Sequence, residues 1–176
     1  MDTNTLVKLT SRAWSLDILA HLHEGIPGRQ AALLTATGAG RTALSQSLHH
    51  LIDLGLLERN PGHGHPLRPE FRLTAKGEAM AAIARKIIRL TPDETERCLI
   101  RRSWTVPVLA LSREPRQFST LRRDLPPITD RALSQSLKNL QGSNWLTRHI
   151  DPAGHPPRPL YQATGRGLEI GQAIGI

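Results

Sequence analysis

The chain has 176 residues, a formal net charge of +8 and a single cysteine. Arg supplies 19 of the 23 basic residues, and because its planar donors fit phosphate groups and guanine edges, the charge predicts a nucleic-acid partner. One cysteine excludes an intramolecular disulfide and a multi-cysteine metal site. No apolar run is long enough for a membrane span, and the N-terminus lacks the apolar core of a signal peptide. We therefore expect a cytoplasmic protein with no membrane contact.

The two halves of the chain repeat one pattern. The hexamer ALSQSL occurs at residues 43–48 and again at 132–137, and a His-Pro segment follows each copy, HPLRP at 65–69 and HPPRP at 155–159. A hexamer repeated in matching surroundings indicates tandem duplication of a unit of roughly 75 residues. We predict two domains, 1–88 and 89–176. Both are basic, with net charges of +3 and +5, so the charge is not confined to a tail.

Each hexamer lies on a predicted amphipathic helix. Leucines recur at helical spacing and are expected to face the core: Leu44, Leu48 and Leu51 in the first copy, and Leu133, Leu137 and Leu140 in the second. A short segment containing Leu and Arg precedes each helix and is followed by a break, GAG or PPIT. Together these features predict a helix–turn–helix in each half.

The other face of each hexamer helix is polar. Most such faces are simply solvated, but Gln, Ser and Arg on a helix laid in the major groove reach base edges. The candidates are Thr42, Ser45, Gln46 and His49 in the first half and Arg131, Ser134, Gln135 and Lys138 in the second. Arg41, Arg122 and Arg123 complete the predicted DNA-binding residues of the helices.

After each hexamer helix, two strand-like runs flank a loop of Gly, Pro and His, which predicts a β-hairpin. A helix–turn–helix followed by a hairpin is the winged-helix arrangement, so we expect a mainly α protein with small β-hairpins. Arg68 and Arg158 occupy matching places in the Pro-framed loops and are predicted to contact the DNA backbone. The segment from about Thr74 to Trp104 is predicted to be largely helical, with Thr91 capping the helix that follows Pro92.

These motifs resemble the HxlR-type winged-helix regulators, relatives of the MarR group. The second half carries RQFSTL, ITDRALSQSLKNL and PPRPLYQATGRG, and the first carries LSQSLHHLIDLGLLER and RPEFRLTAKG. The resemblance covers nearly the whole chain, twice. It implies a bacterial transcriptional regulator that binds specific double-stranded DNA sequences without a cofactor. Members of the family that these motifs resemble are single-domain chains that pair as homodimers. Two units in one chain therefore imply a pseudo-dimer, and homodimerisation of the whole chain stays open.

The chain departs from that family pattern at two further points. In the family that these motifs resemble, members that sense oxidants carry a cysteine well before the Trp of the first helix. Here Cys98 lies only six residues before Trp104, and the first half has no cysteine. We therefore expect a quiet, partly buried thiol rather than a redox sensor. GSNW in the second half also replaces the DLGL of the first, so the two hexamer helices are expected to end differently.

Other functions find little support in the sequence. GAGRTA at residues 38–43 fits a relaxed dinucleotide-binding pattern, but no strand precedes it and a turn explains its glycines. The paired histidines, His21/His23, His49/His50 and His63/His65, do not predict a metal site, and no catalytic motif indicates an enzyme. The alternatives to a transcriptional regulator are a DNA-binding replication or partition protein and a winged-helix module that binds other proteins.

Overall fold

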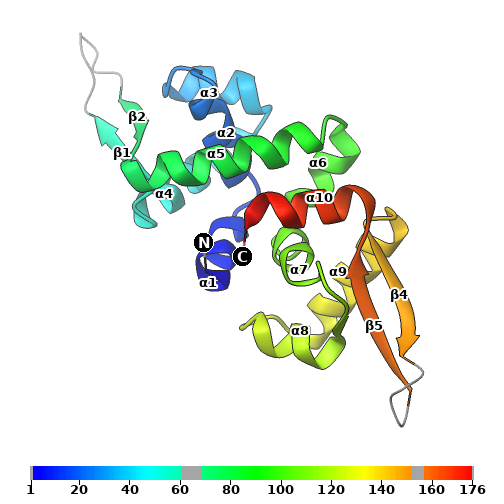
Figure 1. Ribbon diagram of the computed structural model, residues 1–176. Helices are drawn as coiled ribbons and strands as arrows, with labels where there is room; N and C mark the ends of the chain where they lie inside the picture. The colour runs from blue at the N-terminus through cyan, green and yellow to red at the C-terminus, as the bar shows by residue number, and fades with distance from the viewer. Residues whose placement is uncertain (1, 61–68, 152–156, 176) are drawn as a thin grey trace. The chain divides into compact units, whose positions relative to one another are not determined.

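The computed structural model describes residues 2–60, 69–151 and 157–175 (Figure 1). The chain is mostly helical with small antiparallel sheets, as predicted. It divides into two compact units. Arg12–Pro92 form the first repeat unit, and Asp93–Ile176 together with Met1–Ser11 form the second.

The first repeat unit is a helix–turn–helix followed by a two-stranded wing. Its elements are α2 (Ser15–His23), α3 (Gln30–Thr37), α4 (Arg41–Asp53), β1 (Leu57–Asn60), β2 (Glu70–Leu73) and α5 (Ala75–Leu90). The antiparallel ladder places Leu57 opposite Leu73 and Asn60 opposite Glu70. Arg29 adds an isolated bridge to Glu70, so the segment before α3 lies along the wing.

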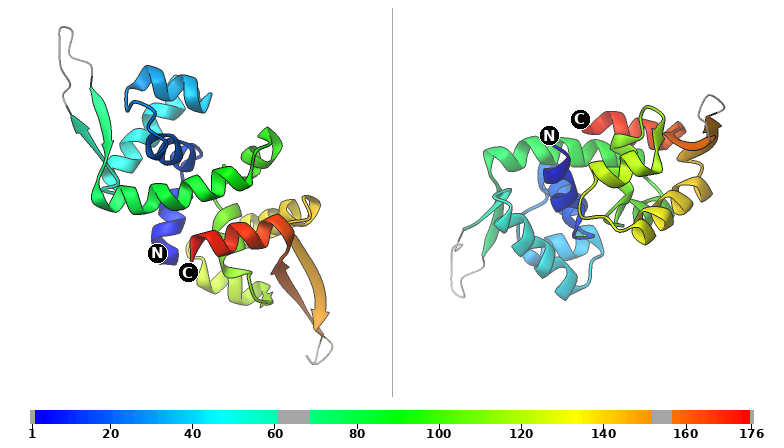
Figure 2. Two further views of the ribbon diagram at one scale, coloured as in Figure 1. Left: turned by 45° about the horizontal axis from the view of Figure 1, so that its top comes forward. Right: turned by 90° about the horizontal axis from the view of Figure 1, so that it is seen from below.

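The elements of the second repeat unit follow the same order, with one helix added before them and a two-residue strand added between the first two repeated helices. They are α6 (Glu94–Ile100), α7 (Thr105–Leu111), β3 (Arg116–Gln117), α8 (Phe118–Asp124), α9 (Asp130–Gly142), β4 (Leu146–Asp151), β5 (Arg158–Ala163) and α10 (Gly165–Ile174). The strands form one sheet in the order β3-β5-β4, and the β4–β5 hairpin joins α9 to α10 (Figure 2). Each half is therefore a winged helix–turn–helix. The short third strand, at the start of RQFSTL, was not predicted.

Leucine burial determines how the two hexamer helices lie. In α4, Leu44, Leu48 and Leu51 are at most 1% exposed, and in α9 the matching leucines are at most 2% exposed. Ser47 and Ser136 also face inward, whereas Gln46 and Gln135 are exposed. The predicted inward leucine face is confirmed in both units. The same six-residue sequence thus provides both the buried side chains and the exposed side chains of each helix.

The two hexamer helices end in the same way, contrary to the expected difference. Gly55 at the end of α4 has φ 68°, and Asn144 takes its place after α9 with φ 58°. Asn tolerates this left-handed conformation better than other residues with a Cβ atom. In both units the next residue closes the turn, since Leu56 and Trp145 donate their N–H groups to the carbonyls of Leu51 and Leu140. GSNW therefore replaces DLGL without changing the helix end.

The role predicted for Thr91 is wrong. Asp93 stands at the N-cap position of α6, although its side chain makes no capping hydrogen bond, while Thr91 ends α5, with its hydroxyl donating to the Ile87 carbonyl at 3.1 Å. A capping side chain must reach the first free N–H groups of its helix, and α6 begins only at Glu94. Thr91 lies too early in the chain for that and is fully buried.

The first helix of the chain belongs to the second repeat unit. Helix α1 (Thr3–Thr10) contacts α7, and its Leu6 and Leu9 are at most 2% exposed. The Thr10 hydroxyl donates to the Ser103 carbonyl at 2.8 Å. The predicted division at residues 88 and 89 places these eleven N-terminal residues in the first domain, whereas their contacts group them with residues 93–176.

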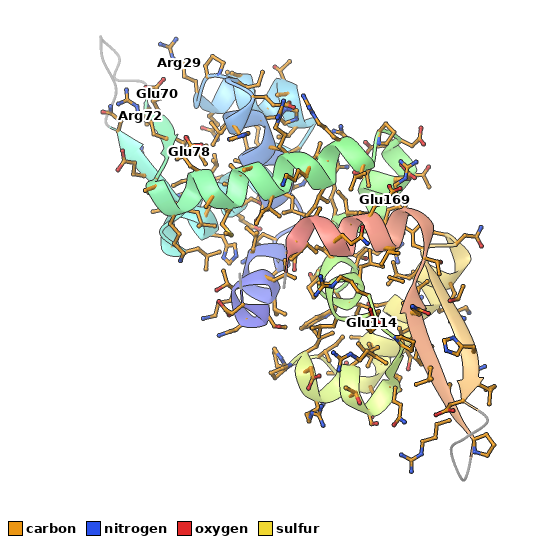
Figure 3. The ribbon with its side chains drawn as sticks, in the orientation of Figure 1. Arg29, Glu70, Arg72, Glu78, Glu114 and Glu169 are labelled. Atoms are coloured by element: carbon orange, nitrogen blue, oxygen red, sulfur yellow. The ribbon has the colours of Figure 1, made fainter. Side chains whose placement is uncertain are left out.

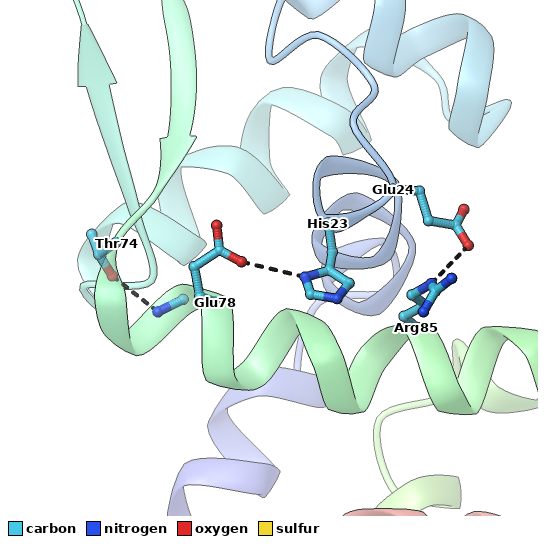
Figure 4. Close-up of polar contacts among 6 residues, drawn as sticks. His23, Glu24, Thr74, Glu78 and Arg85 are labelled. Carbon is cyan, nitrogen blue, oxygen red and sulfur yellow. Dashed lines mark hydrogen bonds and ion pairs between the residues drawn. The ribbon is translucent and has the colours of Figure 1, made fainter.

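Helix α5 packs along α2 in the first repeat unit, and polar contacts border this interface (Figure 4). Glu78 lies 3.3 Å from His23 Nδ1, and Arg85 Nε lies 3.3 Å from Glu24. Thr74 caps α5 by accepting the Gly77 N–H at 3.0 Å. Such partly exposed pairs contribute little stability, so the apolar side of α5 holds the helix in place.

A close backbone approach explains the glycine in each Thr-x-x-Gly motif. A Cβ atom on Gly77 would overlap the Leu56 carbonyl oxygen, and one on Gly167 would overlap that of Trp145. These carbonyls lie just before the wing strands β1 and β4. The glycines therefore allow the helix after each wing to pack directly on the end of the hexamer helix.

Gly167→Ala is expected to lower the free energy of unfolding by about 1–3 kcal/mol, because the added methyl forces the backbone apart. Gly142→Ala is the control, since a Cβ there meets nothing within 4 Å. At that helix-terminal site alanine is expected to be neutral or to stabilise by about 0.4–1 kcal/mol. Urea unfolding of both variants measures the difference. Equal free energies of unfolding would contradict the close approach.

Candidate nucleic-acid interface

The outer face of α4 carries the residues predicted from the first hexamer. Arg41, Thr42, Gln46 and His49 are exposed, and Ser45 is half-buried. An open depression of about 600 Å³ lies on this face, and Arg12, Gln30, His50 and Asp53 complete its lining. The predicted residues of the first unit therefore form one continuous polar surface.

Two contacts on this surface fix how side chains present their polar atoms. His49 Nδ1 lies 2.7 Å from the Ser45 carbonyl oxygen. Because a carbonyl only accepts, His49 Nδ1 is the donor in this contact. Arg12 Nη1 donates to Gln46 Oε1 at 3.4 Å. Arg12 precedes α2, so the interface includes a residue from outside the helix–turn–helix.

The outer face of α9 carries the matching residues of the second unit. Arg131, Ser134, Gln135 and Lys138 are all exposed. Here Gln135 Nε2 donates to Asn139 Oδ1 at 3.0 Å, one helical turn away on the same helix. Two cations, Arg131 and Lys138, stand where α4 has Thr42 and His49. At these two positions the second unit therefore offers more positive charge to a polyanion.

The arginines predicted on α8 are each paired with an acid. Arg122 Nε lies 2.8 Å from Asp130, and Arg123 Nε lies 2.8 Å from Asp124. Hydrogen bonding to Asp124 raises the pKa of Arg123 above its ordinary value. Exposed pairs of this kind are weak and are easily exchanged for phosphate. Their predicted role in DNA binding stays a prediction.

The two hexamer helices, α4 and α9, stand at the recognition-helix position of the helix–turn–helix, and they also begin differently. Gly40 precedes α4 and offers no side-chain cap, and no acidic residue occupies the first turn of α4. In α9, Thr129 accepts the Ala132 N–H at 3.2 Å and Asp130 occupies the first turn. The positive end of the helix dipole is therefore less compensated in α4, where Arg41 adds a full charge.

The wings differ in charge along their described strands. Arg72 Nη2 pairs with Glu70 at 2.9 Å on β2, where both side chains lie together (Figure 3). In the second wing Arg158 is exposed at the start of β5, with Asp151 opposite it in the ladder. Arg68, the predicted counterpart of Arg158, lies outside the described residues.

Sequence reasoning missed two further pairs of cations. Arg12 and Arg102 precede the two Trp residues at matching positions, and Arg59 and Arg148 occupy matching places on the first strand of each wing. All four are exposed. The duplication itself was the available signal, because a basic residue is kept in both copies at each place.

Cys98 is exposed, so the expectation of a partly buried thiol is wrong. It lies on the outer side of α6, while the next two residues, Leu99 and Ile100, are buried. Its Sγ lies 3.6 Å from a Glu94 carboxylate oxygen. The Arg101 guanidinium, which donates to the same carboxylate, lowers the pKa of Glu94.

Within residues 2–60, 69–151 and 157–175, no group of three or more His, Cys, Asp or Glu side chains is arranged to hold a metal ion. The paired histidines His63 and His65 lie outside these ranges. Among the helices described, none has the length and apolar character needed to cross a membrane.

Comparison with known proteins gives a match to one family model along most of the chain. The model described as HxlR-like helix-turn-helix matches residues 9–97 and again residues 99–175. Each winged-helix repeat thus corresponds to one copy of that model.

The individual proteins that resemble this chain match only part of it. The chain is 36% identical over 76 residues to an uncharacterized HTH-type transcriptional regulator of Mycobacterium tuberculosis (strain CDC 1551 / Oshkosh), which is 43% of this chain and 48% of that protein. It therefore spans about half the length of this curated relative. A solved structure described as a candidate MarR-family regulator from Porphyromonas gingivalis W83 is 24% identical, with a TM-score of 0.37 over 51% of this chain and 79% of that one.

Proposed function

The chain belongs to the HxlR-like helix-turn-helix family, and on that premise we propose that it is a transcriptional regulator that binds specific double-stranded DNA sequences through both winged-helix units. One observation carries the proposal. Both recognition helices keep Ser and Gln on the outer face, at Ser45/Gln46 and Ser134/Gln135, while the leucines of the same helices are buried. A face held outward by a rigid core suits readout of base edges in the major groove.

The remaining cations supply the contacts that do not depend on sequence. Arg12, Arg41 and Arg131 lie beside or at the start of the recognition helices, where they can reach phosphates on either side of the groove. Phosphate contacts position a protein on the duplex and provide much of its affinity, and base contacts select the sequence. Arg158 extends the phosphate contact to the second wing.

We propose further that one chain occupies one asymmetric DNA site. Thr42 in α4 is replaced by Arg131 in α9, and His49 is replaced by Lys138. The two helices are therefore expected to recognise different half-site sequences. A symmetric homodimer imposes a palindrome on its operator, and two fused units remove that requirement. Fusion also holds the second unit at high effective concentration once the first has bound.

Gln46→Ala and Gln135→Ala are each expected to relax sequence preference, because a well-placed Gln contact discriminates between bases by about 1–3 kcal/mol. Competition between specific and scrambled duplexes at fixed salt measures the loss. Gln172→Ala serves as the control, since Gln172 is exposed on α10 rather than on a recognition helix. A silent substitution in one unit would mean that this unit supports the other without reading DNA.

Arg158→Ala is expected to weaken binding to all sequences alike and to reduce the slope of log affinity against log salt by about one unit. Arg166→Ala is the control, because it also removes one positive charge but lies on α10, where Arg166 contacts Glu96 at 3.3 Å. Titrations at several salt concentrations give both slopes. A change in preferred sequence with an unaltered slope would assign Arg158 to base readout instead.

One chain per minimal DNA site is the expected stoichiometry, with a consensus that is not palindromic. Native mass spectrometry of the complex counts the chains, and selection from random duplexes gives the consensus. Two chains on a palindromic site would show that the duplication did not replace the homodimer.

A further inference from the structure

We propose that Asp130, the exposed first residue of α9, accepts a hydrogen bond from the amino group of a cytosine and is a specificity-determining residue of the second unit alone. The inference rests on the proposed function, because it requires the outer face of α9 to meet base edges. It adds an acid to a set of predicted DNA-binding residues that are all neutral or positive.

Asp130 stands where the outer face of α9 begins. Its side chain is 77% exposed, and the next residue, Arg131, is exposed as well. Arg122, on α8, donates its Nε–H to Asp130 Oδ1 at 2.8 Å. This contact uses one of the roughly four acceptor sites of a carboxylate. Asp130 therefore keeps acceptor sites for a second partner, while the contact with Arg122 restricts its position.

Formation of α9 does not require an acid at this position. Thr129 accepts the Ala132 N–H at 3.2 Å and so already caps the helix. Helix α4 has the same length of 13 residues and begins with Arg41 at the matching position. An exposed ion pair such as that of Arg122 with Asp130 adds little stability. The fold alone therefore does not explain why the second unit carries an acid where the first carries an arginine.

A carboxylate has few possible partners on DNA. It only accepts hydrogen bonds, and phosphate groups repel it. In the major groove only N4 of cytosine and N6 of adenine donate. In an A·T pair the N6 amino group lies between two acceptors, N7 of adenine and O4 of thymine, whereas N4 of cytosine has an acceptor, O6 of guanine, on one side only. Repulsion of the carboxylate is therefore weaker at cytosine, which is the base that Asp130 selects.

Arg41 at the matching position of α4 has the opposite options. An arginine only donates, so it can contact a phosphate, or O6 and N7 of guanine, but not an amino group. The two units therefore cannot make the same contact at this position. Because a palindromic site places the same base under both helices of a symmetric pair, the exchange of Arg41 for Asp130 favours an asymmetric site.

Neighbouring cations offset the repulsion between Asp130 and the DNA backbone. Arg131 follows it in the chain, and the contact with Asp130 engages only Nε of Arg122, so both Nη groups can donate to phosphate. Asp130 is thus tolerated where cytosine supplies an amino group and is repelled where guanine or thymine supplies an acceptor. Such a residue lowers affinity for wrong sequences as well as favouring the right one.

The test is selection of the full chain and its variants from randomised duplexes. The position facing Asp130 is the one at which Asp130→Ala loses its preference, and we expect cytosine there for the wild-type chain. Asp130→Asn should change this preference to adenine by about tenfold, because an asparagine amide pairs with N6 and N7 of adenine. Affinity for a scrambled duplex should rise in both variants, since a charge that phosphate repels is removed.

Asp124→Asn is the matched control. Asp124 is also an acid paired with an arginine, Arg123 Nε at 2.8 Å, but it lies at the end of α8. Its replacement should leave every base preference unchanged and change affinity for all duplexes alike. Arg41→Ala, in the first unit, should leave the preference for cytosine unchanged. Thermal unfolding of each variant establishes that the fold is kept.

The outcomes separate this inference from the proposed function. No binding by the wild-type chain, or binding without any sequence preference, overturns the proposed function itself. Specific binding in which Asp130→Asn raises affinity without changing any base preference overturns the inference alone and leaves Asp130 a structural acid. So does a wild-type preference for any base other than cytosine at the position that responds to Asp130→Ala.

Discussion

Burial of three leucines on one side of each recognition helix is the constraint on which the rest of the interface depends. Leu44, Leu48 and Leu51 bind α4 to its unit, and rotation of the helix about its axis would expose them at a cost of several kcal/mol. The rotation of the helix is therefore fixed, and with it the identity of the side chains that face outward. Ser47 and Leu48 lie on the buried side of the helix, so Gln46 lies on the opposite side and is exposed.

The same constraint explains how one duplicated sequence supports two different surfaces. Core positions of α4 and α9 carry the same residues, since each must fill the same space against its own unit. The outer positions have no such restriction, and there Thr42 and His49 have become Arg131 and Lys138. Even the glutamines that did not change have different side-chain neighbours, because Arg12 donates to the amide oxygen of Gln46 and Asn139 accepts from the amide nitrogen of Gln135.

Features that follow from local periodicity were predicted from the sequence, and those that depend on distant contacts were not. The leucine spacing predicted α4 and α9, and the turn residues predicted the wings. The strand at Arg116 and Gln117 was not predicted, because it pairs with β5, whose residues lie more than 40 positions away in the sequence. The contact between Arg12 and Gln46 is equally non-local. Thr91 was misassigned because a threonine shortly before a helix resembles a cap in sequence, although its hydroxyl is bound to the preceding helix.

The assignment of α1 changes what the duplication means for the stability of the chain. The second repeat unit is built from two separate stretches, Met1–Ser11 and Asp93–Ile176, with the whole first repeat unit between them. The chain therefore passes between the units twice, at residues 11–12 and 92–93, and the buried Leu6 and Leu9 reach the second unit only through the first connection. Separation at the sequence repeat would remove a helix from the second core. A unit of this size has little apolar surface to lose, so the second copy depends on staying in one chain with the first.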